Sequence, residues 1–316
     1  MKWKRNLLAI AVALAWSSAI AGVSVPNYMF TQAGIYPGAA LTNANGDNLT
    51  QIAGYYFPPS SASHGYVQTG ASFITAEPPN SSSSYLWGIN TSGLAAGGFC
   101  QGSSCDSAPF GAQGYTYDST TGAITAIDFP GSMSTVAYGV SALGVVVGGF
   151  CPTNTLCPLN LFYIASHGFI DDNGTFTQLD YPGSDGTTAF GVNNTETVVG
   201  TYSTFGGNGV IHGFLYQNGA YTDLNFPGAN WTEATGINNS GVVVGYYQDS
   251  QGGVFGFMYY NGQWAQINAR SGGTTNIFGI NDHNDLVGTW SGPNGHNPAI
   301  KGVPTQSIPI LQNEAQ

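Results

Sequence analysis

Short apolar segments alternate with polar turns along most of the chain. In residues 236–245 a Gly-Ile-Asn start leads into the turn Asn239-Ser240-Gly241, which the apolar run 242–244 follows. A turn of Asn, Ser and Gly between two short apolar segments is typical of a β-hairpin. Patterns with a helical period are scarce. The chain is therefore predicted to be all-β and rich in turns.

This ten-residue window is repeated. It occurs five times at constant length, at 88–97, 139–148, 191–200, 236–245 and 279–288, and a looser copy four residues longer spans 41–54. Repetition of this kind indicates a repeat architecture. One window carries Glu196 where others carry the turn glycine. Because Glu tolerates a positive φ poorly, Glu196 is predicted either to be strained or to mark a different turn.

Two further landmarks precede each window. An apolar segment ends in Pro-Gly or a replacement nine residues before each full window, as at Pro182 and Pro227. A His-Gly-aromatic start lies 15 residues before most of these prolines. Its six copies begin at His64, Gln113, His167, His212, Phe255 and His296, and the last copy is degenerate. Together the landmarks predict four short strands in each repeat.

The order of the half-repeats predicts how the chain closes. Each kind of half occurs six times, but the chain opens with a Gly-Ile-Asn half and ends with a His-Gly-aromatic half. A ring removes the exposed edges because the C-terminal strands complete a sheet with the N-terminal ones. We therefore predict a six-bladed β-propeller over residues 22–311, with repeats of 41–54 residues and a tail at 312–316. The alternative is a β-solenoid or an array of β-sandwiches.

The landmarks resemble a family of bacterial extracellular repeats, the HAF repeats, named for a His-Ala-Phe strand start. The corresponding residues are His167-Gly168-Phe169 and His212-Gly213-Phe214, followed by Gly236-Ile237-Asn238 and Val244-Gly245. Gly replaces the middle Ala in nearly every copy. The resemblance covers almost all of the chain after residue 21. It implies secretion and a repeat fold, and it supplies no catalytic residues.

Charge and the N-terminal pattern indicate the compartment. Only 7% of the residues are charged and the formal net charge is −11. Residues 1–21 combine a basic start, an apolar run and Ala19-Ile20-Ala21, which predicts a cleaved signal peptide and a secreted, periplasmic or cell-surface protein. Beyond them only Arg270 and Lys301 are basic, so nucleic acid is excluded as a partner. No later stretch is long and apolar enough to predict a transmembrane segment in the mature chain.

All four cysteines lie in the two longest connections between repeats. Cys100 and Cys105 lie in one, and Cys151 and Cys157 lie in the other. An exported protein with an even number of cysteines is expected to form disulfides, here with three arrangements open. Pairing within each connection is favoured because each bond then closes one loop at equivalent places in the repeat. The alternative is a metal site built from all four thiolates.

Four of the His-Gly-aromatic starts carry histidine, at His64, His167, His212 and His296. If this strand is the innermost of each blade, the imidazoles line the axial channel and could hold a metal or an anion. The simpler interpretation is that each His fixes its blade through a hydrogen bond to neighbouring backbone. No cofactor is predicted. The cluster at 282–285 is a further candidate, for Ca²⁺ or another divalent cation, and there a solvated turn is the simpler interpretation.

Aromatic residues make up 13% of the chain, and those exposed to solvent would suit a carbohydrate ligand. If Trp231 and Trp264 are exposed at blade rims, they suit stacking on sugar rings, whereas most aromatic residues will pack between blades. Arg270 stands where other copies carry Pro, and it either pairs with a carboxylate or reaches an acidic ligand.

The sequence points away from catalysis. It contains neither Gly-x-Ser-x-Gly nor His-Glu-x-x-His. Asp128 and Asp180 share a repeat position with Asn225 and Asn268, which favours turn capping over acid–base work. The predicted function is non-enzymatic recognition or a structural role at the cell surface, with an extracellular polysaccharide (glycan) or cell-envelope component as ligand. The alternative is a secreted hydrolase or lyase with carboxylates and His at the channel mouth.

Overall fold

The computed structural model describes residues 28–59, 62–102, 111–152, 166–204, 210–292 and 297–306. Within these ranges the regular structure consists of 24 strands, with no helix. The predicted signal peptide at 1–21, the propeller limits at 22 and 311, and the tail at 312–316 lie outside the described residues and stay predictions.

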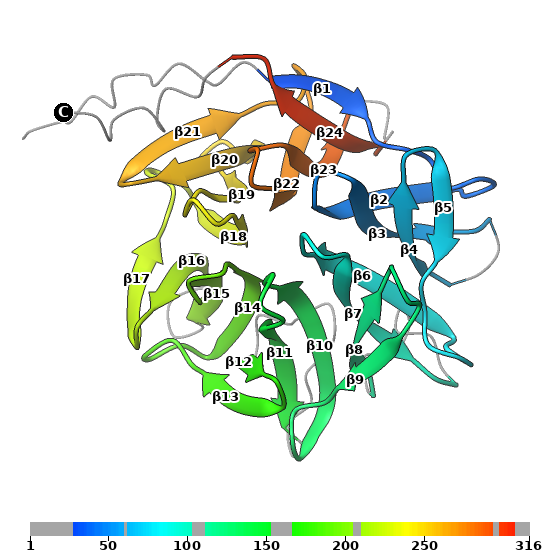
Figure 1. The fold of residues 1–316 in the computed structure, drawn as a ribbon. Helices are drawn as coiled ribbons and strands as arrows, with labels where there is room; N and C mark the ends of the chain where they lie inside the picture. The colour runs from blue at the N-terminus through cyan, green and yellow to red at the C-terminus, as the bar shows by residue number, and fades with distance from the viewer. Residues whose placement is uncertain are drawn as a thin grey trace, which may run out of the picture.

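The strands form six sheets of four antiparallel strands each. Figure 1 shows the sheets as blades around a central axis, with β2, β6, β10, β14, β18 and β22 nearest the axis. The protein is therefore a six-bladed β-propeller, as the half-repeats predict, and the solenoid alternative is wrong.

The blades have the following strands in order from the axis outward. Blade 1 contains β2 (Leu41–Asp47), β3 (Gln51–Phe57), β4 (His64–Thr69) and β5 (Ser72–Thr75). Blade 2 contains β6 (Ser83–Ile89), β7 (Leu94–Cys100), β8 (Gln113–Asp118) and β9 (Ile124–Ile127). Blade 3 contains β10 (Ser132–Val140), β11 (Val146–Pro152), β12 (His167–Asp172) and β13 (Thr175–Leu179).

The second half of the ring repeats the same plan. Blade 4 contains β14 (Gly186–Val192), β15 (Val198–Thr204), β16 (Val210–Gln217) and β17 (Ala220–Leu224). Blade 5 contains β18 (Trp231–Ile237), β19 (Val243–Gln248), β20 (Val254–Tyr260) and β21 (Gln263–Ile267). Blade 6 contains β22 (Thr274–Ile280), β23 (Leu286–Ser291), β24 (Ala299–Pro304) and β1 (Tyr28–Gln32).

Strands from the two ends of the chain close the ring, as predicted, but the closing strand is a different one. β1 pairs with β24 from Tyr28↔Pro304 to Gln32↔Ile300, and the two lie side by side in Figure 1. The sequence predicted that the hairpin at 41–54 completes the last blade, whereas this hairpin forms the two inner strands of blade 1. Residues 28–32 carry none of the repeat landmarks, so the repeat pattern gave no sign of this strand.

The landmarks have fixed places in a blade. The Gly-Ile-Asn segment ends the innermost strand, the His-Gly-aromatic segment is the third strand, and the segment before Pro-Gly is the outermost strand. In blade 6 the register pairs Gly288 with Ile300, as Gly200 pairs with Phe214 in blade 4. Pro298 therefore takes the place that the sequence analysis gave to His296, which itself lies outside the described residues.

Glycine in Gly-Ile-Asn allows the innermost strands of neighbouring blades to touch. Each of these strands has a β-bulge just before the glycine, for example between Ala234 and Gly236. A Cβ added to Gly88 would lie 2.7 Å from the carbonyl oxygen of Tyr138 in the next blade. A Cβ on Gly236 would lie 3.2 Å from the carbonyl oxygen of Phe278. A larger residue would therefore push the blades apart and widen the ring.

The hydrophobic core lies between the faces of adjacent blades. In one cluster Val244 and Met258 of blade 5 pack with Ile277 and Leu286 of blade 6. The third strand contributes a fully buried aromatic ring in five blades, namely Tyr66, Tyr115, Phe169, Phe214 and Phe257. Burying one such side chain stabilises the fold by about 2–3 kcal/mol, so the repeated aromatic residue is explained by blade packing.

Candidate functional site

A cavity of about 490 Å³ lies on the axis of the ring, lined mainly by the innermost strands. Successive residues of each inner strand contribute successive layers to its wall. The residue before the Gly of Gly-Ile-Asn forms one layer, the Gly the next, and the aliphatic residue the third. Because all six blades are built alike, one repeat position becomes one ring of side chains around the axis.

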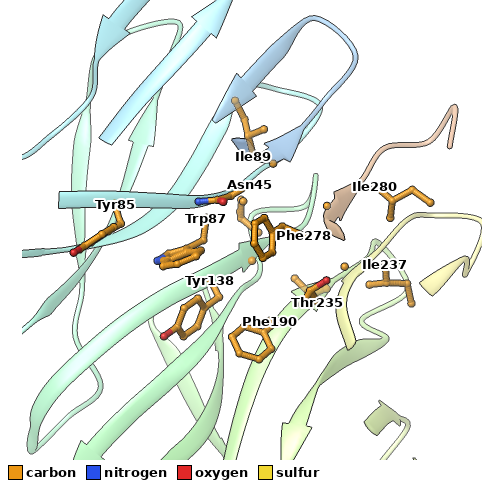
Figure 2. A pocket seen from close by; sticks show the side chains of 18 of the residues that line it. Asn45, Tyr85, Trp87, Ile89, Tyr138, Phe190, Thr235, Ile237, Phe278 and Ile280 are labelled. Atoms are coloured by element: carbon orange, nitrogen blue, oxygen red, sulfur yellow. The ribbon is translucent and has the colours of Figure 1, made fainter. Parts of the chain in front are cut away.

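The layer before the glycines is mostly aromatic. Going round the ring, its members are Asn45, Trp87, Tyr138, Phe190, Thr235 and Phe278. Figure 2 shows the four aromatic members gathered around one common space. The ring centroids of Trp87 and Tyr138 are 5.5 Å apart, and those of Tyr138 and Phe190 are 4.9 Å apart at 70°. Such edge-to-face pairs hold the rings in place.

Further aromatic residues extend the wall toward the end where the inner strands begin. Tyr85 stacks on Trp87 with centroids 6.0 Å apart, and Tyr55 packs edge-on against Tyr85 at 4.8 Å. On blade 5, Tyr246 packs edge-on against Phe278 at 5.9 Å. The cavity therefore presents aromatic surface from blades 1–6 with only a few polar groups between, which is typical of a small-ligand site.

Two oxygen-bearing side chains stand out among the polar groups of the wall. Glu233 is only 6% exposed, and Tyr246 donates a hydrogen bond of 2.6 Å from its hydroxyl to Oε2 of this carboxylate. The Asn45 amide donates from Nδ2 to the carbonyl oxygen of Leu86 at 2.9 Å, and its buried Oδ1 has no hydrogen-bond partner among the described residues. A buried acceptor without a donor is costly, so Asn45 Oδ1 is a local cost in the wall of the cavity.

The layer after the glycines lies between the main cavity and a smaller hollow. Five aliphatic residues and Asp47 line both the main cavity and a smaller hollow of about 60 Å³ beyond it. The Asp47 side chain is fully buried, and its Oδ2 lies 2.6 Å from Nζ of Lys301. Burial by itself lowers the pKa of Lys301, but the hydrogen bond and charge of Asp47, with Asp285 at 3.4 Å, raise it overall. Asp47 is thus committed to an ion pair.

The smaller hollow is bordered by the Asn of Gly-Ile-Asn, which joins neighbouring blades. In each turn the Asn side-chain oxygen accepts backbone N–H groups, as Asn238 Oδ1 does from Val242 at 3.0 Å. In four blades its amide donates to the carbonyl of the equivalent residue in the next blade, whereas the buried Nδ2 of Asn281 has no hydrogen-bond partner among the described residues. These bonds are Asn48 to Asn90 at 2.8 Å, Asn90 to Ser141 at 2.7 Å, Asn193 to Asn238 at 3.2 Å and Asn238 to Asn281 at 3.1 Å. The repeated Asn is therefore explained by blade cohesion.

The described histidines, His64, His167 and His212, lie on the third strand of their blades, so the condition for an axial ring of imidazoles is not met. Nδ1 of His64 lies 2.8 Å from Oε2 of Glu77, and Nδ1 of His167 lies 2.6 Å from Oδ1 of Asp180. His212 has the same relation to Asn225 at 3.2 Å. Each imidazole therefore ties the third strand to the residue after the outermost strand. The simpler interpretation foresaw such a hydrogen bond, although with backbone as the partner.

The other candidate ligand residues lie outside the cavity wall. Trp264 packs against Phe226 and Tyr259 of the core between blades 4 and 5, with centroids 5.4 and 4.7 Å away. Trp231 packs edge-on against Tyr246, with ring centroids 5.8 Å apart. Tyr246 lines the cavity, whereas Trp231 lies behind it. The guanidinium carbon of Arg270 lies 5.2 Å from the ring centre of Trp290, a cation–π contact. The structure does not bring these three residues together.

Cys100 and Cys151 occupy equivalent buried places near the ends of β7 and β11. Their predicted partners, Cys105 and Cys157, lie outside the described residues, so the two pairings stay predictions. Among the described residues no group of three or more His, Cys, Asp or Glu side chains could hold a metal ion. In the cluster proposed for Ca²⁺, Asp282 instead accepts two hydrogen bonds from Asn239, and Asp285 faces Lys301.

The sequence analysis missed the aromatic layer of the cavity. The residue before the Gly of Gly-Ile-Asn is aromatic in four of the six copies. That signal was present, but it indicates a site only once this strand is known to be innermost. Glu233 had no signal, because the equivalent residues of the other blades, Asn43, Tyr85, Val136, Thr188 and Asn276, are mostly of different types and include no acid.

No model of a known protein family and no curated protein sequence matches the chain. Solved structures do match. An acylaminoacyl peptidase of Pyrococcus horikoshii is 12% identical with a TM-score of 0.52, over 88% of this chain and 46% of the peptidase. The tricorn protease is 10% identical with a TM-score of 0.52, over 83% of this chain and 26% of the protease. TolB of Acinetobacter baumannii is 12% identical with a TM-score of 0.50, over 84% of this chain and 66% of TolB.

At these identities the similarities show the β-propeller fold. The chain spans less than two thirds of each of these three proteins. Among the described residues, none forms a helix long and apolar enough to cross a membrane.

Proposed function

We propose that this chain is an exported recognition protein that binds a glycan or another cell-envelope component in the axial cavity of its propeller. The observation that carries the proposal is the cavity of about 490 Å³ with aromatic residues on its wall. Aromatic faces stack on the apolar CH faces of sugar rings. The cavity is also large enough for a monosaccharide or a short oligosaccharide end.

Export, disulfide formation and membership of the HAF-repeat family belong to the same proposal. Export is supported by the basic start, apolar run and small-residue site within residues 1–21. Export favours two disulfides, and we pair Cys100 with Cys105 and Cys151 with Cys157 because each bond then closes one loop at equivalent places in the repeat. Mass spectrometry of the secreted protein without reduction tests export and the number of disulfides: the mature chain should begin at Gly22, and its mass should be four hydrogens lower than that of the reduced chain.

The chemistry of the described wall favours recognition over catalysis. Its carboxylates are Glu233 and Asp47, and Asp47 is paired with Lys301. Hydrolases and lyases that act through carboxylates commonly need two of them in different roles at one bond. Among the described wall residues, Glu233 therefore has no second carboxylate with which to share such a reaction, and this supports a binding function.

A variant that fills the cavity tests the proposal. Thr235 occupies a ring position that is aromatic in four other blades, so Thr235→Phe should fold and reduce the space for a ligand. Thr222→Phe, on the exposed face of the outer strand β17, is the matched control. At least one of the oligosaccharides derived from dextran, alginate and chitosan should bind the wild type in calorimetric titrations. Its affinity should fall about tenfold or more in Thr235→Phe and stay unchanged in Thr222→Phe.

Two outcomes would overturn the proposal. One is a wild-type protein that binds none of these oligosaccharides. The other is binding that survives Thr235→Phe unchanged, since the ligand would then lie outside the cavity.

A further inference from the structure

The charged side chains that line the axial cavity are carboxylates. Among its described wall residues there is no Lys, Arg or His, whereas Glu233 and Asp47 contribute carboxylates, of which Asp47 is paired with Lys301. Seven aromatic rings surround these groups. The negative face of an aromatic ring attracts cations, so the rings and the carboxylates favour the same kind of ligand.

The charge of the whole protein points the same way. Beyond residue 27 the only Lys and Arg side chains are Arg270 and Lys301. Lys301 lies between Asp47 and Asp285, and Arg270 lies over Trp290, so neither contributes to the wall. In a chain of formal charge −11, a wall with carboxylates and no cation among its described residues favours a cationic group over an anion.

The Glu233 carboxylate is held in place before a ligand arrives. The Tyr246 hydroxyl donates a hydrogen bond of 2.6 Å to its Oε2, and Tyr246 is itself packed edge-on against Phe278 and Trp231. A carboxylate fixed in this way loses little freedom on binding, which increases its affinity for a matching donor.

We infer that the group bound in the cavity is a primary ammonium carried on a sugar ring, that is, an amino sugar whose nitrogen is not acetylated. This inference rests on the proposed recognition function and specifies its ligand. The ammonium supplies three N–H donors and a positive charge, which match the Glu233 carboxylate. The pyranose ring presents its CH faces to the aromatic layer that includes Trp87 and Tyr138.

A pair of small sugars separates this inference from the broader proposal. The β-1,4-linked disaccharide of glucosamine carries two amines, and its N-acetylated counterpart carries none. In calorimetric titrations at a pH that protonates the amines, the wild type should bind the amine form about tenfold or more tightly than the acetylated form. A disaccharide limits the non-specific attraction that a long polycation would have for an acidic protein.

Two single substitutions test whether the Glu233 carboxylate causes the preference for the amine disaccharide. Glu233→Gln should reduce affinity for the amine disaccharide about tenfold and leave the acetylated one nearly unchanged. Glu196→Gln removes the same charge at an exposed turn beside the smaller hollow and should leave both affinities unchanged. The comparison of the two sugars on the wild type needs no variant, so the test stands even if Glu233→Gln folds poorly.

Three results would count against the inference. Equal binding of the two disaccharides, lost in Thr235→Phe, would keep the cavity as a glycan site and overturn the ammonium. If Glu196→Gln and Glu233→Gln weaken binding of the amine disaccharide equally, the preference for the amine arises from the net charge of the protein and not from the cavity. If the wild type binds neither disaccharide but binds another glycan of the panel, the ligand class is wrong and the recognition function stands.

Discussion

Nζ of Lys301 lies 2.6 Å from Oδ2 of Asp47, and this ion pair joins the third strand of the last blade to the innermost strand of the first. Asp47 occupies the ring position that carries Ile or Val in every other blade. The fold therefore places a buried charge pair at the one junction where strands from the two ends of the chain meet. The pair is expected to stabilise closure of the ring.

Removing only the cation should destabilise the protein strongly. Lys301→Met leaves a fully buried carboxylate without its partner, which costs about 3 kcal/mol of unfolding free energy. The double variant Asp47→Val with Lys301→Met restores the aliphatic layer found in the other blades and should recover most of this loss. Urea denaturation of the three proteins measures both differences. A double variant as unstable as the single one would show that the charges themselves are required.

The same pair predicts a loss of stability at alkaline pH. Because the folded state raises the pKa of Lys301, the stabilisation is fully present below the ordinary lysine pKa of 10.5 and is lost as the pH rises through the folded value. The advantage of the wild type over Lys301→Met should therefore shrink above pH 10.5. A difference between the two proteins that stays constant into strong alkali would contradict this assignment.

Ser141 is the one non-Asn residue at the ring position that joins neighbouring blades. Its hydroxyl accepts the backbone N–H of Val145 at 3.2 Å, but it has no amide to donate to blade 4. Ser141→Asn should add a hydrogen bond to the carbonyl of Asn193 and raise the unfolding free energy by about 1 kcal/mol. The reverse change, Asn90→Ser, should lower it by a similar amount. Thermal and urea unfolding measure both, and a shift of the two variants in the same direction would refute this role.

The sequence predicted much of the fold because the repeat positions each have one dominant physical cause. The Gly of Gly-Ile-Asn permits close approach of inner strands, Asn joins blades, and the aromatic residue of the third strand fills the core. Such causes act in most blades and therefore repeat, although Ser141 replaces the Asn of blade 3 and Ile300 replaces the aromatic residue of blade 6. β1 was missed because its place is fixed by pairing with β24, a contact that one short segment makes once.

The candidate site was predicted less well, and for a related reason. Histidine drew attention because it repeats, yet repetition here reflects the bond from His64 to Glu77 and its equivalents within single blades. The cavity depends on differences between blades, such as Glu233 and Asn45 at places where other blades carry other residues. A difference of this kind acquires meaning only when the strand order shows which residues face the axis.

Glu196 is strained in the turn it occupies. Its φ is 57°, at the place of Gly93, Gly144 and Gly241, and its N–H bonds to the Asn193 carbonyl at 3.1 Å as in those turns. The turn is therefore the same, and the alternative of a different turn is wrong. Glu196→Gly should stabilise the protein by about 1 kcal/mol and raise Tm by about 2 °C. Gly241→Glu should do the opposite, and an unchanged or lower Tm for Glu196→Gly would show that the turn tolerates Glu without strain.

Asp171 should make stability depend on pH in the acid range. The side chain is buried in the turn between β12 and β13, where Oδ1 accepts the N–H of Gly174 at 2.7 Å. Burial raises the pKa of Asp171, the bond from Gly174 opposes this, and the charge of Asp172 adds to it, with a net rise. Asp171→Asn keeps the acceptor and removes the charge, so it should unfold at higher urea than the wild type at pH 7.

The sign of the effect follows from the raised pKa. The folded state disfavours ionised Asp171, so the wild type pays this penalty above the folded pKa and is free of it below the unfolded value of 3.8. The advantage of Asp171→Asn should therefore vanish as the pH falls below 3.8. Asp172→Asn, at the exposed neighbour, should show a smaller difference at pH 7. An Asp171→Asn variant that is less stable than the wild type at pH 7 would show that the carboxylate is needed for the Gly174 bond.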